Sequence, residues 1–190
     1  MKLTQKFTVA ASGIILCFTL IACNDSSNRA AEEQPTVVTE KTSDPLPAPG
    51  VNQPTLVSPA ADGALLLTAE NGSAIGPAIK YMPEWRAFGW FTAADRVEWD
   101  VAVAAAGNYA ATLEWSVSDE DAGKEFLLEA KGRQLTGIVA PSGSWETYKT
   151  VAIGNIQLDA GNQKIVFKAN KQFDKGAILD LRQVTLRPVK

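Results

Sequence analysis

The sequence contains no histidine among its 190 residues. It therefore lacks the commonest general base, the Ser-His-Asp triad and imidazole ligands for metals. Its two cysteines are Cys17 and Cys23, so the rest of the chain has no thiol for a disulfide, a nucleophile or a zinc site. The chain also lacks a Gly-x-Ser-x-Gly motif and a phosphate-binding glycine loop. These absences predict a protein that is not an enzyme.

The acidic residues slightly outnumber the basic ones, 21 against 18. This balance argues against nucleic acid as a partner, because nucleic-acid binding requires a basic face. Abundant carboxylates leave one enzymatic route open, a pair of carboxyl groups as in glycoside hydrolysis. Glu98, Asp100 and Glu114, however, lie on the polar side of alternating segments, which is typical of a solvated strand face.

The N-terminus has the pattern of an export signal. Lys2 and Lys6 precede an almost wholly apolar stretch from residue 7 to residue 21. This stretch is shorter than the roughly 20 apolar residues of a transmembrane helix, so it predicts a signal peptide over residues 1–22. Its end, Leu-Ile-Ala-Cys, resembles the bacterial lipobox, which implies that Cys23 is acylated and anchors the chain in a membrane. The alternative is an ordinary secretory peptide with an incidental cysteine.

Residues 23–55 predict a disordered tether, because Ser, Asn, Thr, Glu and Pro dominate and few large apolar residues are present to offset the ordering entropy. Asn24 follows the cysteine, where Asp favours inner-membrane retention in enterobacterial lipoproteins. The lipoprotein resemblance therefore implies a lipid-anchored protein of the cell envelope, at the outer membrane.

Residues 56–190 have the size of one domain and the pattern of an all-β fold. Apolar and polar residues alternate along 97–103 and 109–117, around the turn Gly107-Asn108. The segment 120–131 contains good helix formers but no helical apolar stripe, so we expect a strand there. The pattern predicts a β-sandwich or jelly roll. Further expected strands cover residues 64–69, 88–91, 125–130, 134–139, 148–153, 163–169 and 178–187.

Several short motifs occur in a characteristic order over residues 64–188. They are Leu67-Thr68-Ala69-Glu70, Tyr81-Met82-Pro83-Glu84-Trp85, Gly89-Trp90, Val97-Glu98-Trp99, Ala106-Gly107-Asn108-Tyr109, Ser142-Gly143-Ser144-Trp145, Leu158-Asp159-Ala160-Gly161 and Leu179-Asp180-Leu181-Arg182. In this order the domain resembles carbohydrate-binding modules of family six and family 35. These modules have a galactose-binding-like β-sandwich, and the version appended to bacterial fucosidases is the most similar.

The resemblance implies a sugar cleft between loops at one end of the sandwich. Aromatic rings line such clefts, and the corresponding residues are Trp90 and Trp145, with Trp85 as an alternative to Trp90. Family-six modules often carry a sugar-contacting asparagine two residues before the last-strand aspartate, where this chain has Ile178; Asn170 is a candidate replacement. The other interpretation is that these rings close the end of the sandwich. Trp99 and Trp115 lie in the apolar phase of their strands and are expected in the core.

The same resemblance implies a structural calcium ion, Ca2+, held by Glu70 and Asp180 with backbone oxygens. Thr68 stands where related modules often have a further acid. The alternative is that Asp180 pairs with Arg182 or a lysine, and that Glu70 is a surface residue.

Two functions follow. In the first, a membrane-anchored lipoprotein presents a non-catalytic module that binds a glycan or polysaccharide. In the second, the sandwich is a tethered structural module that binds partner proteins in the envelope. Exposure and convergence of Trp85, Trp90 and Trp145 on one loop face favour the first, and burial of these rings favours the second.

Overall fold

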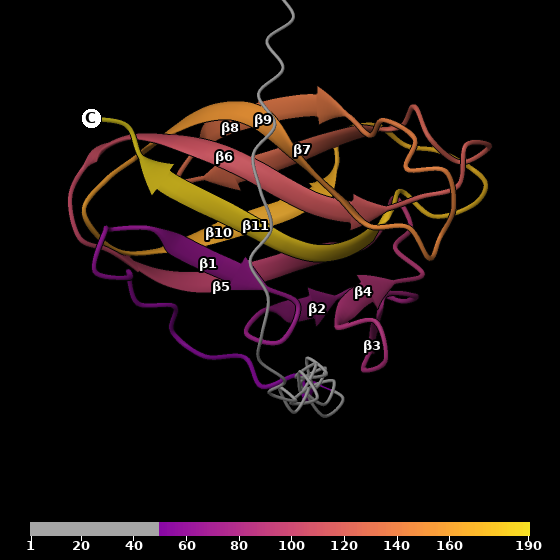
Figure 1. Ribbon diagram of the computed structural model, residues 1–190, viewed down its shortest axis with the longest axis horizontal. Helices are drawn as coiled ribbons and strands as arrows, with labels where there is room; N and C mark the ends of the chain where they lie inside the picture. Colours follow the sequence, from indigo (N-terminus) through magenta and orange to yellow (C-terminus); the bar gives the residue numbers. More distant parts are fainter. Residues whose placement is uncertain (1–49) are drawn as a thin grey trace, which may run out of the picture. The chain divides into compact units, whose positions relative to one another are not determined.

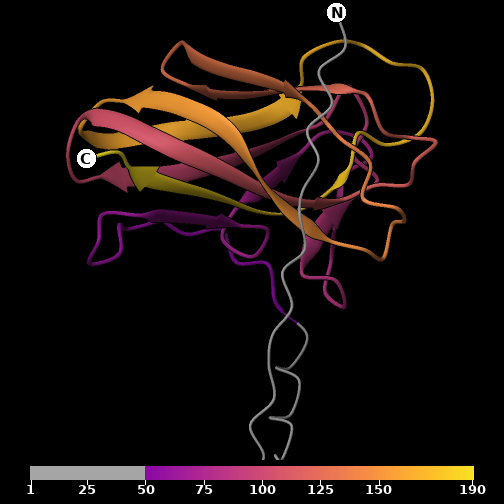
Figure 2. The same ribbon diagram turned by 45° about the horizontal axis from the view of Figure 1, so that its top comes forward.

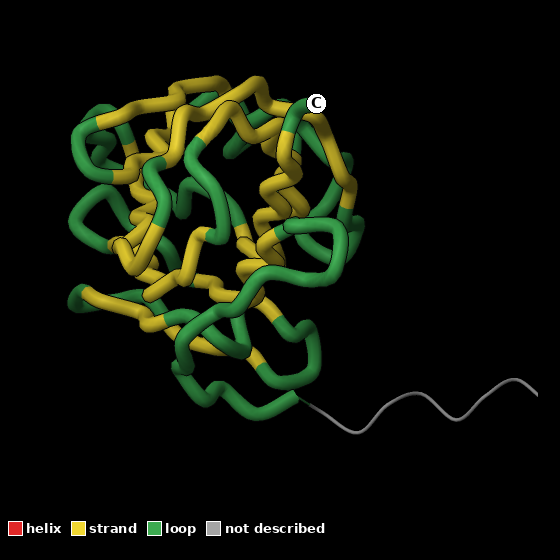
Figure 3. Tube along the Cα trace, turned by 90° about the vertical axis from the view of Figure 1, so that its left-hand side faces the viewer, coloured by secondary structure: helices red, strands yellow, loops and turns green. Residues whose placement is uncertain are grey.

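The computed structural model describes residues 50–190. The predicted signal peptide, the predicted lipidation site Cys23 and most of the predicted tether lie outside the described residues. Within residues 50–190 the chain forms strands and loops alone (Figure 3), and no helix there is long and apolar enough to cross a membrane.

Two sheets with antiparallel pairing face each other as a β-sandwich (Figure 1). The first sheet has the order β3-β4-β11-β6-β9, and β1 pairs with the other end of β11. The second sheet has the order β2-β5-β10-β7-β8. The strands are β1 (Leu65–Thr68), β2 (Ser73–Ile75), β3 (Lys80–Met82), β4 (Ala87–Gly89), β5 (Arg96–Val103), β6 (Gly107–Ser116), β7 (Glu125–Ala130), β8 (Arg133–Ile138), β9 (Lys149–Leu158), β10 (Gly161–Ala169) and β11 (Asp180–Pro188). The all-β sandwich expected from the sequence is confirmed.

The hydrophobic core fills the space between the two sheets. Trp99 on β5 and Trp115 on β6 are each 1% exposed, as the alternation predicted. Their indole N–H groups donate to backbone carbonyls, Trp99 to Thr68 at 2.8 Å and Trp115 to Ala140 at 3.0 Å. Each buried ring thus contributes apolar area without leaving a polar atom unpaired.

Two of the three shortest strands, β2 and β3, were not predicted. β2 and β3 have three residues each, too few for an alternating pattern to appear in the sequence. They form because β5 and β4 offer open edges, which is a tertiary effect. In the segment 120–131 the predicted strand is confirmed from Glu125 onward, and residues 120–124 form the loop that precedes it.

The segment before β1 lies against the domain. The Asn52 side chain donates to the carbonyls of Ala69 and Gly72, at 2.7 and 2.8 Å. Val57 exchanges backbone hydrogen bonds with β5, donating to Asp100 at 2.8 Å and accepting from Ala102 at 2.9 Å. Hydrogen bonding to the fold therefore begins within the stretch that the sequence analysis assigned to the tether.

Long loops gather at one end of the sandwich, opposite the C-terminus (Figures 1 and 2). They connect β2 to β3, β4 to β5, β6 to β7, β8 to β9 and β10 to β11. Because these connections come from both sheets, their side chains meet over the end of the core.

Candidate functional site

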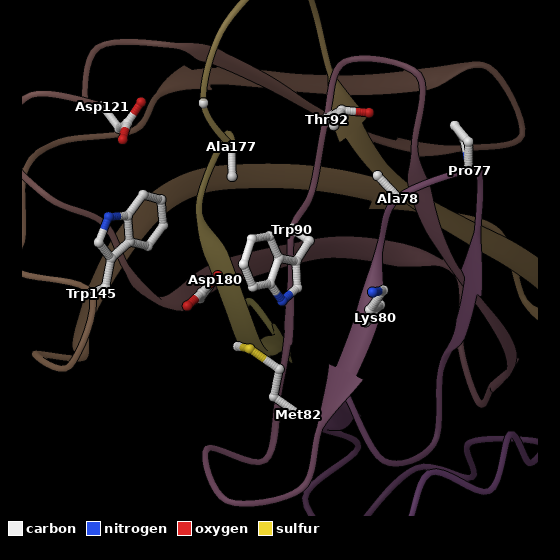
Figure 4. A pocket seen from close by; sticks show the side chains of 11 residues that line it. Pro77, Ala78, Lys80, Met82, Trp90, Thr92, Asp121, Trp145, Ala177 and Asp180 are labelled. Atoms are coloured by element: carbon white, nitrogen blue, oxygen red, sulfur yellow. The ribbon is translucent and has the colours of Figure 1, made fainter.

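A cavity of about 670 Å³ lies among these loops. Residues from all five connections, from β3 and from the start of β11 line it, and Figure 4 shows their side chains. The charged and the large side chains among them are Lys80, Met82, Trp90, Asp121, Trp145 and Asp180. A cavity of this size is in the range of small-molecule sites.

Trp90 is held outward by its backbone. It directly follows β4 and has φ of +59°, in the left-handed region that bulky residues avoid. The next residue, Phe91, is fully buried, and its carbonyl accepts the Ile178 N–H at 2.8 Å. The left-handed turn lets the chain place Phe91 in the core and leave the Trp90 ring 65% exposed. A strained and exposed aromatic residue at a cavity is typical of a functional position.

Trp145 enters the cavity from the β8–β9 connection. Its carbonyl accepts a hydrogen bond from the Ser116 hydroxyl at 2.7 Å. Ser142 at the start of the same loop bonds Val117 in both directions, accepting its N–H at 2.8 Å and donating to its carbonyl at 2.9 Å. The Trp145 side chain packs partly against the core. The ring is therefore fixed in place before any ligand arrives, which reduces the entropy cost of binding.

Asp95 joins two of the loops that line the cavity. Its carboxylate is 2% exposed and accepts the backbone N–H of Ala78 at 3.1 Å and that of Thr92 at 2.7 Å. The Thr92 hydroxyl adds a third bond at 2.6 Å. Burial alone would raise the pKa of Asp95, but these hydrogen bonds outweigh it and lower the pKa below the ordinary value. The ionised carboxylate therefore ties the β2–β3 loop to the β4–β5 loop.

Asp180, at the start of β11, lies between the Trp90 and Trp145 rings in Figure 4. Burial raises the pKa of its carboxyl group to about 7, and no hydrogen bond from a described residue offsets this. Gly89 makes the arrangement possible, since a side chain at that position would collide with Met82 and approach the Asp180 carboxylate within 2.8 Å. The cavity floor thus carries a desolvated carboxyl group without a partner in residues 50–190.

The other charged groups of the cavity are Asp121 and Lys80. Asp121 pairs with Lys124, at 3.0 Å between Oδ1 and Nζ. The Lys80 ammonium lies 6.0 Å from the centre of the Trp90 ring, and in Figure 4 it is on the side of that ring away from Asp180. Asp180 is therefore the acidic group that faces the space between the two indoles.

Two of the predicted sugar contacts lie elsewhere. Trp85 stacks on Tyr148, with ring centres 6.2 Å apart, and its carbonyl accepts a hydrogen bond from Arg182. Asn170 donates to the Glu125 carboxylate at 3.1 Å. Neither residue lines the cavity, and their contact with sugar stays a prediction. The structure brings Trp90 and Trp145 together and leaves Trp85 and Asn170 outside.

Sequence reasoning did not find Lys80, Asp95 or the place of Asp180 in the cavity. Lys80 and Asp95 belong to no motif, and only the tertiary structure brings their loops together. For Asp180 the sequence did hold a signal, because the resemblance to family-six modules implies a polar sugar contact near the start of the last strand. In this chain the residue that faces the cavity there is the aspartate, and not the residue two positions before it. Ile178, two residues earlier, is fully buried.

The residues implied for calcium do not fit a calcium site. Glu70 forms a bidentate pair with Arg86, Oε1 with Nε at 2.5 Å and Oε2 with Nη2 at 2.9 Å. Asp180 faces the cavity, and burial raises the pKa of its carboxyl group. Residues 50–190 hold no group of three or more acidic, histidine or cysteine side chains suited to a metal. We therefore derive no role for calcium at this pair.

Known structures share this architecture. A family 35 carbohydrate-binding module from Clostridium thermocellum is 18% identical, with a TM-score of 0.53, over 64% of this chain and 97% of that one. A family 6 module from Cellvibrio mixtus lichenase 5A, solved with cellotriose, is 17% identical, with a TM-score of 0.53, over 66% of this chain and 97% of that one. An exo-β-1,3-galactanase from Phanerochaete chrysosporium, solved with β-1,3-galactotriose, is 18% identical, with a TM-score of 0.53. The match covers 65% of this chain but 29% of the galactanase.

No protein-family model matches the sequence, and no curated protein matches it either. At these identities the similarity concerns the fold. Residues 50–190 thus have the β-sandwich fold of family 35 and family 6 carbohydrate-binding modules, as the motifs predicted.

Proposed function

We propose that the loop-end cavity binds a glycan, and that the chain is a lipoprotein which holds this non-catalytic module at the cell envelope. The observation that carries the proposal is the convergence of Trp90 and Trp145 on one cavity. Both rings are held by the fold, and one of them is exposed at the cost of a strained backbone.

The chemistry of the cavity suits a sugar. Pyranose rings present flat patches of C–H groups, which pack on indole faces, and hydroxyl groups, which need polar partners. Trp90 and Trp145 supply the faces, while Asp180 and Thr92 supply acceptors at the same cavity. A small number of placed polar groups in a mostly apolar cavity is the usual composition of a small-molecule site. The structural neighbour that was solved with cellotriose, itself a carbohydrate-binding module, supports the same class of ligand.

The anchoring part of the proposal rests on the sequence motif that ends at Cys23. An acylated cysteine would attach the chain to a membrane, and the following polar residues would separate the domain from the lipid surface. Labelling cells with a radioactive or alkyne-tagged fatty acid tests this part. We expect label on the wild-type chain and none on Cys23→Ser. Label on both chains, or on neither, would contradict lipidation at Cys23.

A panel of immobilised polysaccharides and oligosaccharides tests the binding function. The full-length chain is compared with Trp145→Ala, and Trp85→Ala is the matched control because its ring is exposed but lies outside the cavity. We expect the wild type and Trp85→Ala to retain the same glycans and Trp145→Ala to lose them.

Loss of binding in Trp85→Ala but not in Trp145→Ala would move the site to the Trp85–Tyr148 stack. Absence of binding to every glycan, with a folded chain, would favour the second function, a tethered module that binds envelope proteins. The convergence of two of the three candidate rings argues for the first function over the second.

A further inference from the structure

The Asp180 carboxylate limits which sugar the cavity can bind well. It is partly buried between two tryptophans, and its burial is not offset by a hydrogen bond or ion pair with another described residue. A desolvated carboxylate is unfavourable until a cation or hydrogen-bond donors reach it. An acidic sugar would bring a second negative charge to this point.

The two indoles favour a cation at the same place. Trp faces attract an ammonium group through the ring quadrupole, and the effect grows when the cation is desolvated. A positive group between Trp90 and Trp145 would interact favourably with both indole faces and would also pair with the carboxylate. A neutral hydroxyl would satisfy the carboxylate alone.

We propose that the cavity selects a glycan unit with a free, protonated amine, an amino sugar whose ammonium group binds Asp180 between Trp90 and Trp145. This inference rests on the proposed glycan-binding function and gives it a ligand class. The rest of the sugar ring keeps the C–H faces that stack on the indoles.

The remaining charges of the cavity are compatible with this ligand. Asp121 already has a cation, Lys124, so it does not compete for the ligand. Lys80 is exposed and lies against the opposite side of Trp90 from Asp180, so its long side chain can extend away into solvent. Arg182 does not line the cavity: it pairs with Glu114 at 2.9 Å, and its guanidinium carbon lies 3.4 Å from the centre of the Tyr148 ring.

A matched series of ligands tests the proposal. β-1,4-linked glucosamine, N-acetylglucosamine and glucose oligomers of equal length differ only in the group at one carbon: an amine, an acetamide or a hydroxyl. Calorimetric titration of the full-length chain compares all three near neutral pH, because the attraction requires both a protonated amine and an ionised Asp180 carboxyl group, whose pKa is about 7. We expect the amine series to bind about tenfold tighter than the hydroxyl series, with a preference that weakens as salt is added.

Two variants assign the preference to one carboxylate. Asp180→Asn keeps the size and the acceptor oxygen but removes the charge, so we expect the amine and hydroxyl series to bind alike. Asp121→Asn is the control, because it removes a paired carboxylate from the same cavity, and we expect it to keep the preference. Thermal unfolding confirms that each variant is folded.

Equal affinity for amine and hydroxyl oligomers in the wild type would overturn the amino-sugar proposal and leave glycan binding intact. Tighter binding of uronate oligomers, lost in Lys80→Gln, would also overturn it, by showing that Lys80 sets the selectivity. Failure of every glycan to bind would instead contradict the proposed function itself.

Discussion

Four of the tryptophans form two pairs with opposite environments. Trp99 and Trp115 lie on long strands, are 1% exposed and donate their N–H groups to backbone carbonyls. Trp90 and Trp145 lie in connections, line the cavity and make no comparable contribution to the centre of the core. The same side chain thus stabilises the fold at one pair of positions and shapes a site at the other.

The difference follows from the backbone. In a strand, period two decides which face a residue occupies, so the two inner rings are buried by their phase. In the loops, local features determine where each ring lies. Trp90 has a left-handed backbone conformation, and serine hydroxyl groups hold the loop that carries Trp145. The comparison predicts that substitutions of the inner pair change stability, and that substitutions of the outer pair change binding.

The largest effect is expected for the inner pair. Trp115→Ala should lower the free energy of unfolding by about 3–5 kcal/mol, because a large buried ring leaves a cavity and its carbonyl partner loses a donor. Denaturant titration followed by circular dichroism measures this loss. A change below about 1 kcal/mol would show that the ring is not part of the core.

Asp95 connects the two regions, since it is buried like the inner pair but holds the cavity loops. Asp95→Ala should lower the free energy of unfolding by about 2–3 kcal/mol, because three donors lose a charged acceptor. Two of these donors are backbone N–H groups, one in each loop. The pKa of Asp95 is lowered by folding, so its contribution is present above the unfolded value of 3.8 and is lost as pH falls through the folded pKa.

The same substitution should weaken glycan binding more than its effect on stability explains, because the loops that carry Ala78, Thr92 and Trp90 are released from each other. Asp95→Asn, which keeps one acceptor oxygen, should recover part of both properties. Unchanged glycan affinity in a folded Asp95→Ala chain would show that the Asp95 hydrogen bonds do not position the cavity loops.

The outer pair should affect binding. Trp90→Ala and Trp145→Ala should each weaken the glycan identified on the panel by at least about tenfold, about 1.4 kcal/mol, since each removes a stacking face. Their free energies of unfolding should change less than that of Trp115→Ala. Titration calorimetry beside denaturant titration separates the two quantities. If Trp90→Ala or Trp145→Ala lowered the free energy of unfolding as much as Trp115→Ala, the two pairs would not differ in their role.

The backbone at Trp90 gives a smaller effect. In the left-handed region an L residue with a Cβ is disfavoured by about 1–2 kcal/mol relative to glycine, although glycine's freedom in the unfolded chain offsets part of this. Trp90→Gly should therefore be about 1 kcal/mol more stable than Trp90→Ala, and both should bind poorly. Equal stabilities would indicate that the left-handed conformation is not retained.

Asp180 predicts that the stability of the folded chain depends on pH. Folding raises its pKa from 3.8 to about 7, so the folded chain holds a proton that the unfolded chain has released. Stability should therefore fall as pH rises between these values and level off above about 7. Because the chain has no histidine, no imidazole obscures the upper half of this range. Thermal unfolding across the range should show the decrease in the wild type and not in Asp180→Asn.

The sandwich and its inner pair were predictable because alternation along β5 and β6 is a local property of the sequence. The cavity was predictable only in part. Trp90 and Trp145 were found through resemblance to known motifs, whereas the places of Lys80, Asp95 and Asp180 depend on how five connections meet in space. Glu70 illustrates the limit of resemblance, because its side chain is taken by Arg86, a partner that no motif indicated.

The most direct test of glycan binding at the loop end is a structure of the chain with a bound oligosaccharide. We predict a sugar ring packed on Trp90 and Trp145, with a hydrogen bond from the sugar to the Asp180 carboxylate. A sugar bound on the Trp85–Tyr148 stack, with the loop-end cavity unaffected, would contradict the account.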